Sequence, residues 1–103
     1  MYRLEFLEIA KNDMDNIIYY ISNNLKNNSA ARELANNFIS GANKILDFPY
    51  GSSKYISIGK LKYEYRYVKI KNFLMFYTIN EEEKVITIVR ILYKKMDISN
   101  ILK

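Results

Sequence analysis

The chain has 103 residues, among them ten Tyr, five Phe, three Gly and one Pro, and half of its residues are apolar. This length and composition fit one compact domain with a real core, which predicts a single domain over residues 1–103. Cys and His are both absent, which excludes disulfides, thiolate metal sites and the commonest zinc ligand, and we expect no metal and no cofactor. No apolar run approaches the length of a membrane span, so a cytoplasmic protein without membrane contact is expected.

The net charge of +5 is concentrated in one segment of the chain. Residues 1–50 carry five Lys or Arg against six Asp or Glu, residues 51–80 carry six against one, and residues 81–103 carry five against four. Clustered positive charge is typical of a protein with an acidic or nucleic-acid partner. Many lysine-rich surfaces bind nothing, and composition alone leaves these two interpretations about equal. The clustering slightly favours a partner.

The N-terminal half predicts a strand followed by two helices. Residues 2–7 alternate apolar and charged side chains, as in a half-buried strand. Between residues 9 and 25 apolar side chains recur every three or four positions, which predicts an amphipathic helix. The run Asn27-Asn28-Ser29 interrupts this pattern, and Ser29 is expected to cap a second helix, which ends near Asp47 because a proline follows. Two such helices joined by about three residues must lie antiparallel as a hairpin.

The C-terminal half predicts strands. Residues 51–59 form a polar loop or a weak strand, and residues 63–70 alternate in the manner of a strand. Residues 73–79 and 85–92 are apolar strands joined by a charged turn, and Asp97 is expected to cap a short terminal turn that docks back on the domain. The order β-α-α-β-β-β predicts an α+β fold, in which the helical hairpin covers one face of a mainly antiparallel twisted sheet.

Four segments in a fixed order carry a family resemblance. The opening strand leads into EIAKNDMDNIIYYI, which is followed by SAARELANNFISGANKILDFPYGS, YRYVKIKNFLMFYTI and VITIVRILYKKMDISNIL. Together, from Tyr2 to Leu102, they resemble the RelE/ParE-type toxins of type II toxin–antitoxin systems, the family of plasmid stabilisation proteins. The resemblance implies the same fold and a growth inhibitor neutralised by a cognate antitoxin. An acidic antitoxin would be attracted to a basic toxin and would form a hetero-oligomer with it.

The family divides by mechanism. ParE-like members resemble inhibitors of DNA gyrase that act by binding, and the long hairpin and Arg90 slightly favour this branch. RelE-like members resemble ribosome-dependent nucleases that cut mRNA, and in that case Arg66, Tyr93 and Lys95 fall near the catalytic positions. Against the nuclease, Leu74 stands where the RelE-like pattern has an arginine, and no His is present. The chain is an enzyme only in this second case. A third alternative is a relative that binds an antitoxin but has lost toxicity.

Partner binding is expected on the sheet face that the helices leave open. Lys69 and Lys71 are the strongest candidates, because side chains two positions apart share one face of a strand. Tyrosine rings lie on that face too, and rings interleaved with cations suit stacked bases or the side chains of a partner. The expected partner-binding residues are Tyr65, Tyr67, Lys69, Lys71, Arg90 and Lys94.

Three of the candidate residues also have a structural interpretation. Arg66 alternates in phase with apolar residues, so it could point toward the helices and pair with a carboxylate such as Asp47. Arg90, in phase with Ile88, is open to the same interpretation. A tyrosine at the end of a strand, such as Tyr93, is more often structural than catalytic.

Overall fold

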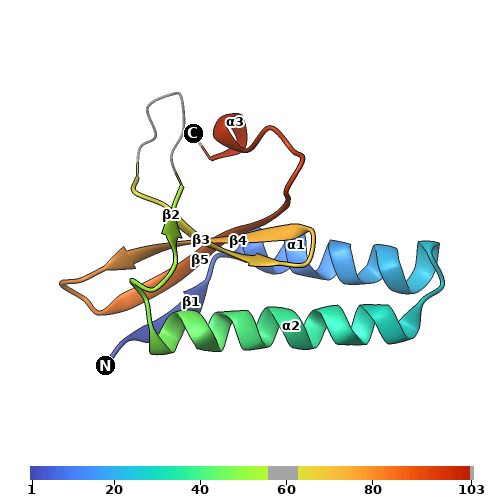
Figure 1. The fold of residues 1–103 in the computed structure, drawn as a ribbon, viewed down its shortest axis with the longest axis horizontal. Coiled ribbons are helices and arrows are strands. Elements are labelled where there is room, and N and C mark those ends of the chain that lie inside the picture. The colour runs from blue at the N-terminus through green and yellow to red at the C-terminus, as the bar shows by residue number, and fades with distance from the viewer. Residues whose placement is uncertain (56–62, 103) are drawn as a thin grey trace.

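The computed structural model describes residues 1–55 and 63–102 and shows a helical hairpin packed on one twisted sheet (Figure 1). In chain order the elements are β1 (Arg3–Phe6), α1 (Glu8–Tyr19), the π-helical segment η1 (Tyr20–Asn24), α2 (Asn28–Asp47), β2 (Ser53–Lys54), β3 (Arg66–Ile70), β4 (Phe73–Asn80), β5 (Val85–Tyr93) and α3 (Ile98–Ile101). The predicted α+β fold is confirmed. Of the weak strand expected over residues 51–59, only β2 is seen, and residues 56–59 lie outside the described residues. Within the described residues, the helices are too short or too polar to cross a membrane.

The five strands form one sheet in the order β1-β5-β4-β3-β2. The strands β3, β4 and β5 form the predicted antiparallel meander, and β2 adds to its edge. β1 runs parallel to β5, from the pair Arg3↔Val85 to the pair Phe6↔Ile88. The first and last strands therefore lie side by side, and the sheet is mainly antiparallel with one parallel edge.

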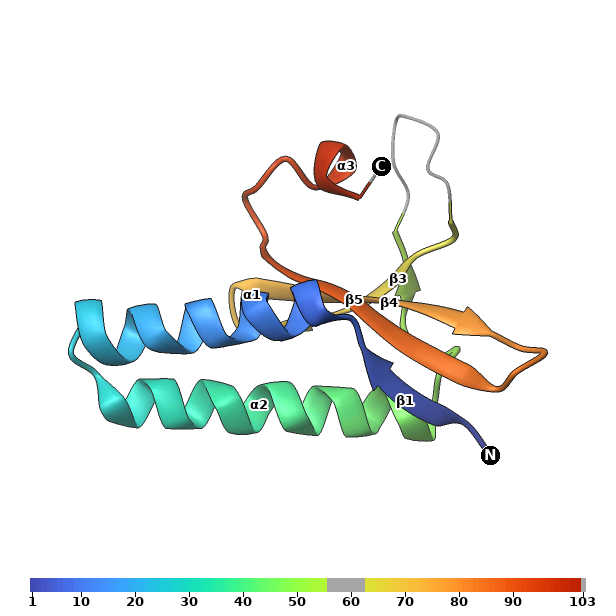
Figure 2. The same ribbon diagram turned by 180° about the vertical axis from the view of Figure 1, so that it is seen from behind.

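The helical hairpin covers one face of the sheet, with α1 over β5 and α2 over β3 (Figure 2). The buried positions of α2 recur every three or four residues: Ala31, Leu34, Phe38, Ala42 and Ile45. The helix ends at Asp47 as predicted, but its cap is Asn27, not Ser29. The side chain of Asn27 accepts a hydrogen bond from the N–H of Ala30 at 3.0 Å, the reach that an N-cap needs.

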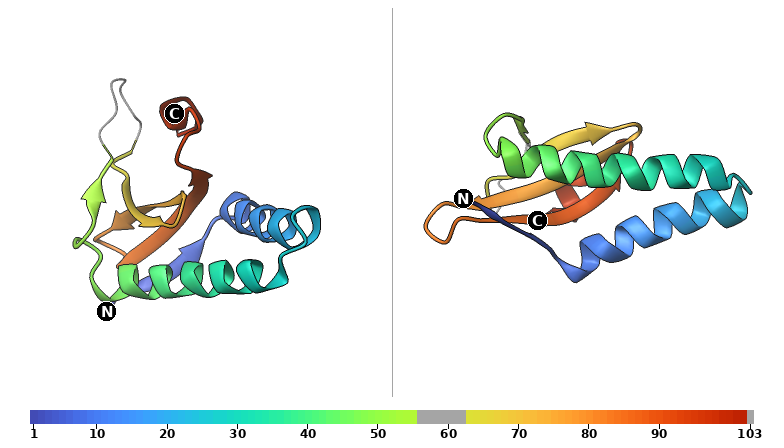
Figure 3. Two further views of the ribbon diagram at one scale, coloured as in Figure 1. Left: turned by 45° about the vertical axis from the view of Figure 1, so that its right-hand side comes forward. Right: turned by 90° about the horizontal axis from the view of Figure 1, so that it is seen from below.

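The two faces of the sheet carry two separate cores. The core under the helices includes the fully buried Phe38, Ile45, Met75, Tyr77, Ile86, Ile88 and Ile91. The core on the other face, which we call the reverse face, consists of Tyr65, Phe76, Leu92, Ile98 and Leu102. Figure 3 shows α3 on the side of the sheet away from α2. The predicted docking of the C-terminal segment is therefore confirmed. Asp97 stands at the N-cap of α3, but its side chain accepts from the side-chain amide of Asn100 and makes no cap bond to the backbone.

A β-bulge in β5 changes which side chains share a face. Phe76 of β4 is opposite Arg90, whereas the next residue, Tyr77, is opposite Ile88, so Val89 is the extra residue. Beyond the bulge the alternation is shifted by one position. Arg90 is consequently out of phase with Ile88, and the prediction that these two share a face is wrong.

Candidate partner-binding surface

Basic side chains gather at the end of the sheet where β3 turns into β4. Lys69 precedes this turn and Lys71 lies within it, with φ at 55°. The N–H of Lys94 donates to the carbonyl oxygen of Asn72 at 2.9 Å, which brings the end of β5 to the same place. At its other end β4 runs into a turn with three glutamates, residues 81–83. Charge is therefore segregated along the sheet, basic at one end and acidic at the other.

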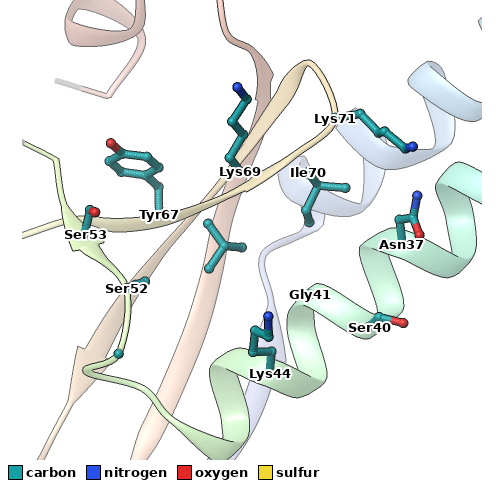
Figure 4. Close-up of a pocket in the computed structure, with 12 residues that line it drawn as sticks. Asn37, Ser40, Gly41, Lys44, Ser52, Ser53, Tyr67, Lys69, Ile70 and Lys71 are labelled. Carbon is teal, nitrogen blue, oxygen red and sulfur yellow. The ribbon is translucent and has the colours of Figure 1, made fainter.

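A groove of about 630 Å³ lies between α2 and β3 at this basic end (Figure 4). The residues that line it are Asn37, Ser40, Gly41, Lys44, Gly51, Ser52, Ser53, Tyr67, Val68, Lys69, Ile70 and Lys71. Gly41 allows the close approach of α2 to β3, because a Cβ there would lie 2.6 Å from Cδ1 of Ile70. The groove is thus open, polar along the helix and bordered by three lysines, Lys44, Lys69 and Lys71.

Lys69 and Lys71 do not share a face, contrary to the prediction. Lys69 is paired with Leu74, which packs in the reverse-face core, so its side chain leaves β3 on that side. β3 ends at Ile70, and Lys71 turns toward α2, where its ammonium lies 3.7 Å from the carboxylate of Glu33. The strand alternation used for the prediction does not extend through a turn with positive φ.

The reverse face is not the open trough of tyrosines that the sequence predicts. Tyr65 is only 7% exposed, and its hydroxyl donates to the carbonyl oxygen of Leu102 at 3.1 Å. Burial raises the pKa of Tyr65 above that of a free tyrosine. The ring of Tyr67 packs against that of Phe76, with 5.8 Å between centroids. These tyrosines build a core that the C-terminal segment covers, whereas Lys69 stays exposed beside them.

Arg66 is held by the segment that connects α2 to β2. Its Nη1 donates to the carbonyl oxygen of Ser52 at 2.8 Å, and its guanidinium lies 5.0 Å from the ring centroid of Tyr50. The alternation of β3 was predicted correctly, since Arg66 lies on the helix side of the sheet, opposite Tyr77. The expected pairing with Asp47 is absent among the described residues. Carbonyl oxygens and an aromatic ring take the place of the carboxylate.

Arg90 makes a structural ion pair. Its Nε donates to Oδ2 of Asp13 at 2.8 Å and its Nη2 to Oδ1 at 2.9 Å. The hydrogen bond to Asp13 raises the pKa of the guanidinium further, so Arg90 is charged at every pH of interest. Its side chain is 23% exposed. The guanidinium of Arg90, which the sequence predicts to bind a partner protein, is therefore already paired with Asp13.

The three residues expected to form a nuclease site do not come together. Tyr93 is opposite Phe73, which is opposite Ile70, so Arg66 lies two strands and four positions away from Tyr93. At ordinary sheet spacings the two Cα atoms are roughly 16 Å apart. Tyr93 is 39% exposed, and its ring and that of Phe73 pack edge to face, with 5.9 Å between the ring centroids. Lys95 follows it in an exposed turn.

A polar cluster at the acidic end of the sheet was not predicted. The carboxylate of Glu81 accepts hydrogen bonds from the hydroxyls of Tyr2 at 2.8 Å and Tyr50 at 2.6 Å, and from the ammonium of Lys84. The bonds from Lys84, Tyr50 and Tyr2 lower the pKa of Glu81 to about 2. The bond to Glu81 raises the pKa of Tyr50 to about 12. The three segments that meet here are far apart in the chain, and no local pattern predicts their contact.

The described residues contain no group of acidic side chains arranged to hold a metal ion. The carboxylates of Asp13 and Glu81, for example, each accept hydrogen bonds from neighbouring side chains.

Solved structures share this fold over nearly the whole chain. A chain of the chromosomal ParDE toxin–antitoxin system from P. aeruginosa is 18% identical, with a TM-score of 0.69, covering 90% of this chain and 96% of the other. A chain of the archaeal RelE–RelB complex from Pyrococcus horikoshii is 14% identical, with a TM-score of 0.62, covering 91% and 96%. A chain of the E. coli RelBE toxin–antitoxin complex is 18% identical, with a TM-score of 0.53, covering 93% and 100%.

The sequence also matches a family model. Among curated proteins, none matches the chain with significant sequence similarity. Residues 4–98, by contrast, match the family described as the ParE toxin of the type II toxin–antitoxin system parDE. This match runs from the second residue of β1 to the first residue of α3, and so covers both long helices and nearly all of the described sheet. The chain belongs to the ParE toxin family of type II toxin–antitoxin systems.

Proposed function

We propose that this protein stops cell growth by binding and inhibiting DNA gyrase. The observation that carries the proposal is the match of residues 4–98 to the ParE toxin family. The ParE-like branch of the resemblance implies inhibition of gyrase by binding, without a catalytic site. A single domain acting in the cytoplasm suffices for such a role. It needs a surface complementary to its target and no catalytic centre.

The geometry of the candidate nuclease residues supports a binding mechanism. General acid–base catalysis needs its groups within hydrogen-bond reach of the same substrate atoms. Arg66 is instead fixed on the carbonyl of Ser52, roughly 16 Å from Tyr93 between Cα atoms at ordinary sheet spacings. The chain contains no His that could replace either of them as a proton-transfer group.

We also propose that an acidic antitoxin neutralises the protein in a hetero-oligomer. The similar structures come from a ParDE system, a RelE–RelB complex and a RelBE complex, and their printed descriptions name toxin–antitoxin systems. The net charge of +5 and the lysines at the basic end of the sheet suit an acidic partner. Lys69, Lys71 and Lys94 are the cations that we propose for this contact. Tyr65, Tyr67 and Arg90 contribute by holding the fold.

The alternative function is a ribosome-dependent mRNA endonuclease that uses Arg66, Tyr93 and Lys95. One observation favours it: Tyr93 is partly exposed and two lysines follow it directly, so the site offers cations to a phosphate group. A further alternative is a relative that binds the antitoxin and has lost toxicity.

Controlled expression in a bacterial host tests these functions together. We expect growth arrest, accompanied by loss of supercoiling activity when purified protein is added to gyrase, and no new ends on translated mRNA in primer extension. Cut mRNA without gyrase inhibition would establish the nuclease. Normal growth, with neither gyrase inhibition nor mRNA cleavage, would support the third function, a relative that binds the antitoxin but is not toxic. Tyr93→Phe is the matched variant, since it removes one hydroxyl that only the nuclease requires.

A further inference from the structure

The strand β1 forms one free edge of the sheet, at the opposite end of the strand order from β2. β5 lies on one side of β1, and among the described residues no strand lies on its other side. In the view from below, Figure 3 shows this outer side of β1 facing away from the other strands. The main-chain groups along an unpaired edge can bond to another strand, and a second copy of the chain is one source of such a strand.

The main-chain groups of β1 point alternately toward β5 and outward. The N–H of Arg3 donates to the carbonyl oxygen of Lys84 at 2.8 Å, and the N–H of Leu7 donates to that of Ile88 at 2.9 Å. Residues 3, 5 and 7 therefore bond to β5, because every second residue of a strand points the same way. The residues between them, 4 and 6, consequently direct their N–H and C=O groups outward, away from β5.

The side chains of β1 are separated by polarity. Tyr2, Leu4 and Phe6 pack against the core under the helices. Arg3 and Glu5 point to the reverse face, since successive side chains of a strand point to opposite faces. The two charged groups lie 3.3 Å apart in an ion pair whose side chains are both more than half exposed, and such a pair adds little stability. The edge thus carries one cation and one anion, two positions apart, beside an apolar row.

A two-fold axis at Leu4 makes this edge complementary to itself. When two copies of β1 pair antiparallel about that axis, Leu4 faces Leu4 of the second copy, and their outward groups form a hydrogen-bonded pair. Arg3 of each copy then faces Glu5 of the other at a position without main-chain bonds, where opposite side chains are closest. Tyr2 of each copy faces Phe6 of the other, so the apolar row continues across the contact.

Charge and main-chain phase exclude the neighbouring registers. A shift of two positions sets Arg3 against Arg3 of the second copy, or Glu5 against Glu5, and like charges directly opposite are destabilising. A shift of one position sets residues that point outward against residues that bond to β5. Natural sheets protect an edge with short strands and charged side chains. In β1, however, the two charges have opposite signs and compensate each other across the axis, which favours pairing.

We propose that two copies of this chain pair along β1, in the register that sets Arg3 of each copy against Glu5 of the other, and join their five-stranded sheets into one. The pairing supplies about six main-chain hydrogen bonds, two from each facing pair of residues with outward groups. β3 and β2 lie at the far edge of each sheet, so the lysines of the β3–β4 turn stay accessible in the dimer. The proposal concerns the contact of the chain with itself and does not depend on the proposed function.

The mass of the purified full-length protein, measured by analytical ultracentrifugation from micromolar to millimolar concentration, tests the pairing. We expect the mass to rise from one chain to two and no further, because the two-fold contact uses the whole edge. Amide hydrogen exchange locates the contact. The amide hydrogens of Leu4 and Phe6 should exchange rapidly in dilute protein and be protected in concentrated protein, whereas that of Glu5 should be protected in both.

Charge variants test the register. Arg3→Glu sets carboxylates against each other at both cross-strand positions and should weaken dimerisation about tenfold or more. Arg32→Glu makes the same change in net charge on the exposed surface of α2 and should have little effect. Arg3→Glu with Glu5→Arg exchanges the two charges and should restore dimerisation. The single variants Arg3→Glu and Glu5→Arg should each dimerise poorly alone and form a mixed dimer when combined, because their charges are then complementary.

Dimerisation with protected Leu4 and Phe6 amides, lost in Arg3→Glu and recovered in the double variant, would support the proposal. It would be overturned by the mass of one chain at every concentration, by assemblies larger than a dimer, by equal effects of Arg3→Glu and Arg32→Glu, or by a Leu4 amide that exchanges rapidly in the dimer. The exchange measurement uses the wild-type protein alone, so a folding defect in a variant does not weaken the test.

Discussion

The carboxylate of Asp13 in α1 accepts two hydrogen bonds from the guanidinium of Arg90 in β5, at 2.8 and 2.9 Å. The same carboxylate accepts the N–H of Ile91 at 2.9 Å. β1 accompanies β5 only as far as Ile88, so Asp13 closes the strand edge just beyond the point where β1 stops. One side chain thereby fixes the first helix to the last strand.

Replacing Asp13 by Ala should lower the free energy of unfolding by about 2 kcal/mol, because the partly exposed Arg90 loses its ion-pair partner and the N–H of the buried Ile91 loses its acceptor. Urea denaturation measures the change. Lys11→Ala is the control, since Lys11 pairs with Glu8 at 3.9 Å on an open helix surface. Its effect should stay within about 0.5 kcal/mol. Equal effects of the two variants would contradict the structural role given to Asp13.

The bulge beside Arg90 shows where the sequence stops predicting this fold. The alternation in residues 66–70 correctly assigns the faces of β3, and the apolar period correctly predicts both helices. In β5 both faces are buried, so the hydrophobic pattern carries no mark of the extra residue Val89. A shift of one position then reverses every assignment that follows, Arg90 included.

Tyr77→Phe should lower the free energy of unfolding by about 1 to 2 kcal/mol, because it leaves a buried carbonyl without its donor. The ring of Tyr77 is fully buried, and its hydroxyl donates to the carbonyl oxygen of Pro49 at 2.6 Å. Tyr93→Phe removes the same atom at a partly exposed site where no described residue bonds to the hydroxyl. Thermal denaturation of both should show a lower melting temperature for the first variant alone. A similar loss in Tyr93→Phe would contradict this account.

Gly41→Ala should leave stability nearly unchanged, since the gain in helix propensity of about 1 kcal/mol is offset by contact of the new Cβ with Ile70. In an Ile70→Val background the nearest atom, Cδ1, is gone. There the same substitution should stabilise the protein by about 1 kcal/mol. Urea denaturation of the four proteins gives the coupling between the two sites. A coupling of zero would show that α2 does not approach β3 closely at Gly41.

Glu81 should make the protein sensitive to acid. Its pKa is about 2 in the folded state, below the ordinary value of 4.5, so its stabilising effect is complete above pH 4.5 and is lost as the pH falls toward 2. Tyr50 acts in the opposite direction: its raised pKa of about 12 means that stability is lost between pH 10 and 12. Urea midpoints recorded against pH should show a smaller acid loss in Glu81→Gln. Identical pH profiles for wild type and variant would contradict the cluster.

The candidate binding surface was predicted only in outline. The segment rich in Lys was recognised from the charge count, and Lys69 does line the groove. The role of Lys44 was missed, because on its own it reads as an ordinary solvated lysine of α2. Only the close approach of α2 to β3 at Gly41 brings Lys44 to the groove beside β3. Likewise, Tyr65 is buried and Tyr67 is partly buried because the C-terminal segment docks over them, and the periodicity of the sequence does not predict where that segment docks.

The most direct measurement is the inhibition of gyrase supercoiling by the purified protein, compared with the Tyr93→Phe variant at the same concentrations. If the protein acts by binding, both proteins inhibit supercoiling to the same extent, and an equimolar acidic antitoxin abolishes the effect. Supercoiling that proceeds normally with either protein, while wild type but not Tyr93→Phe cuts translated mRNA, would contradict this account.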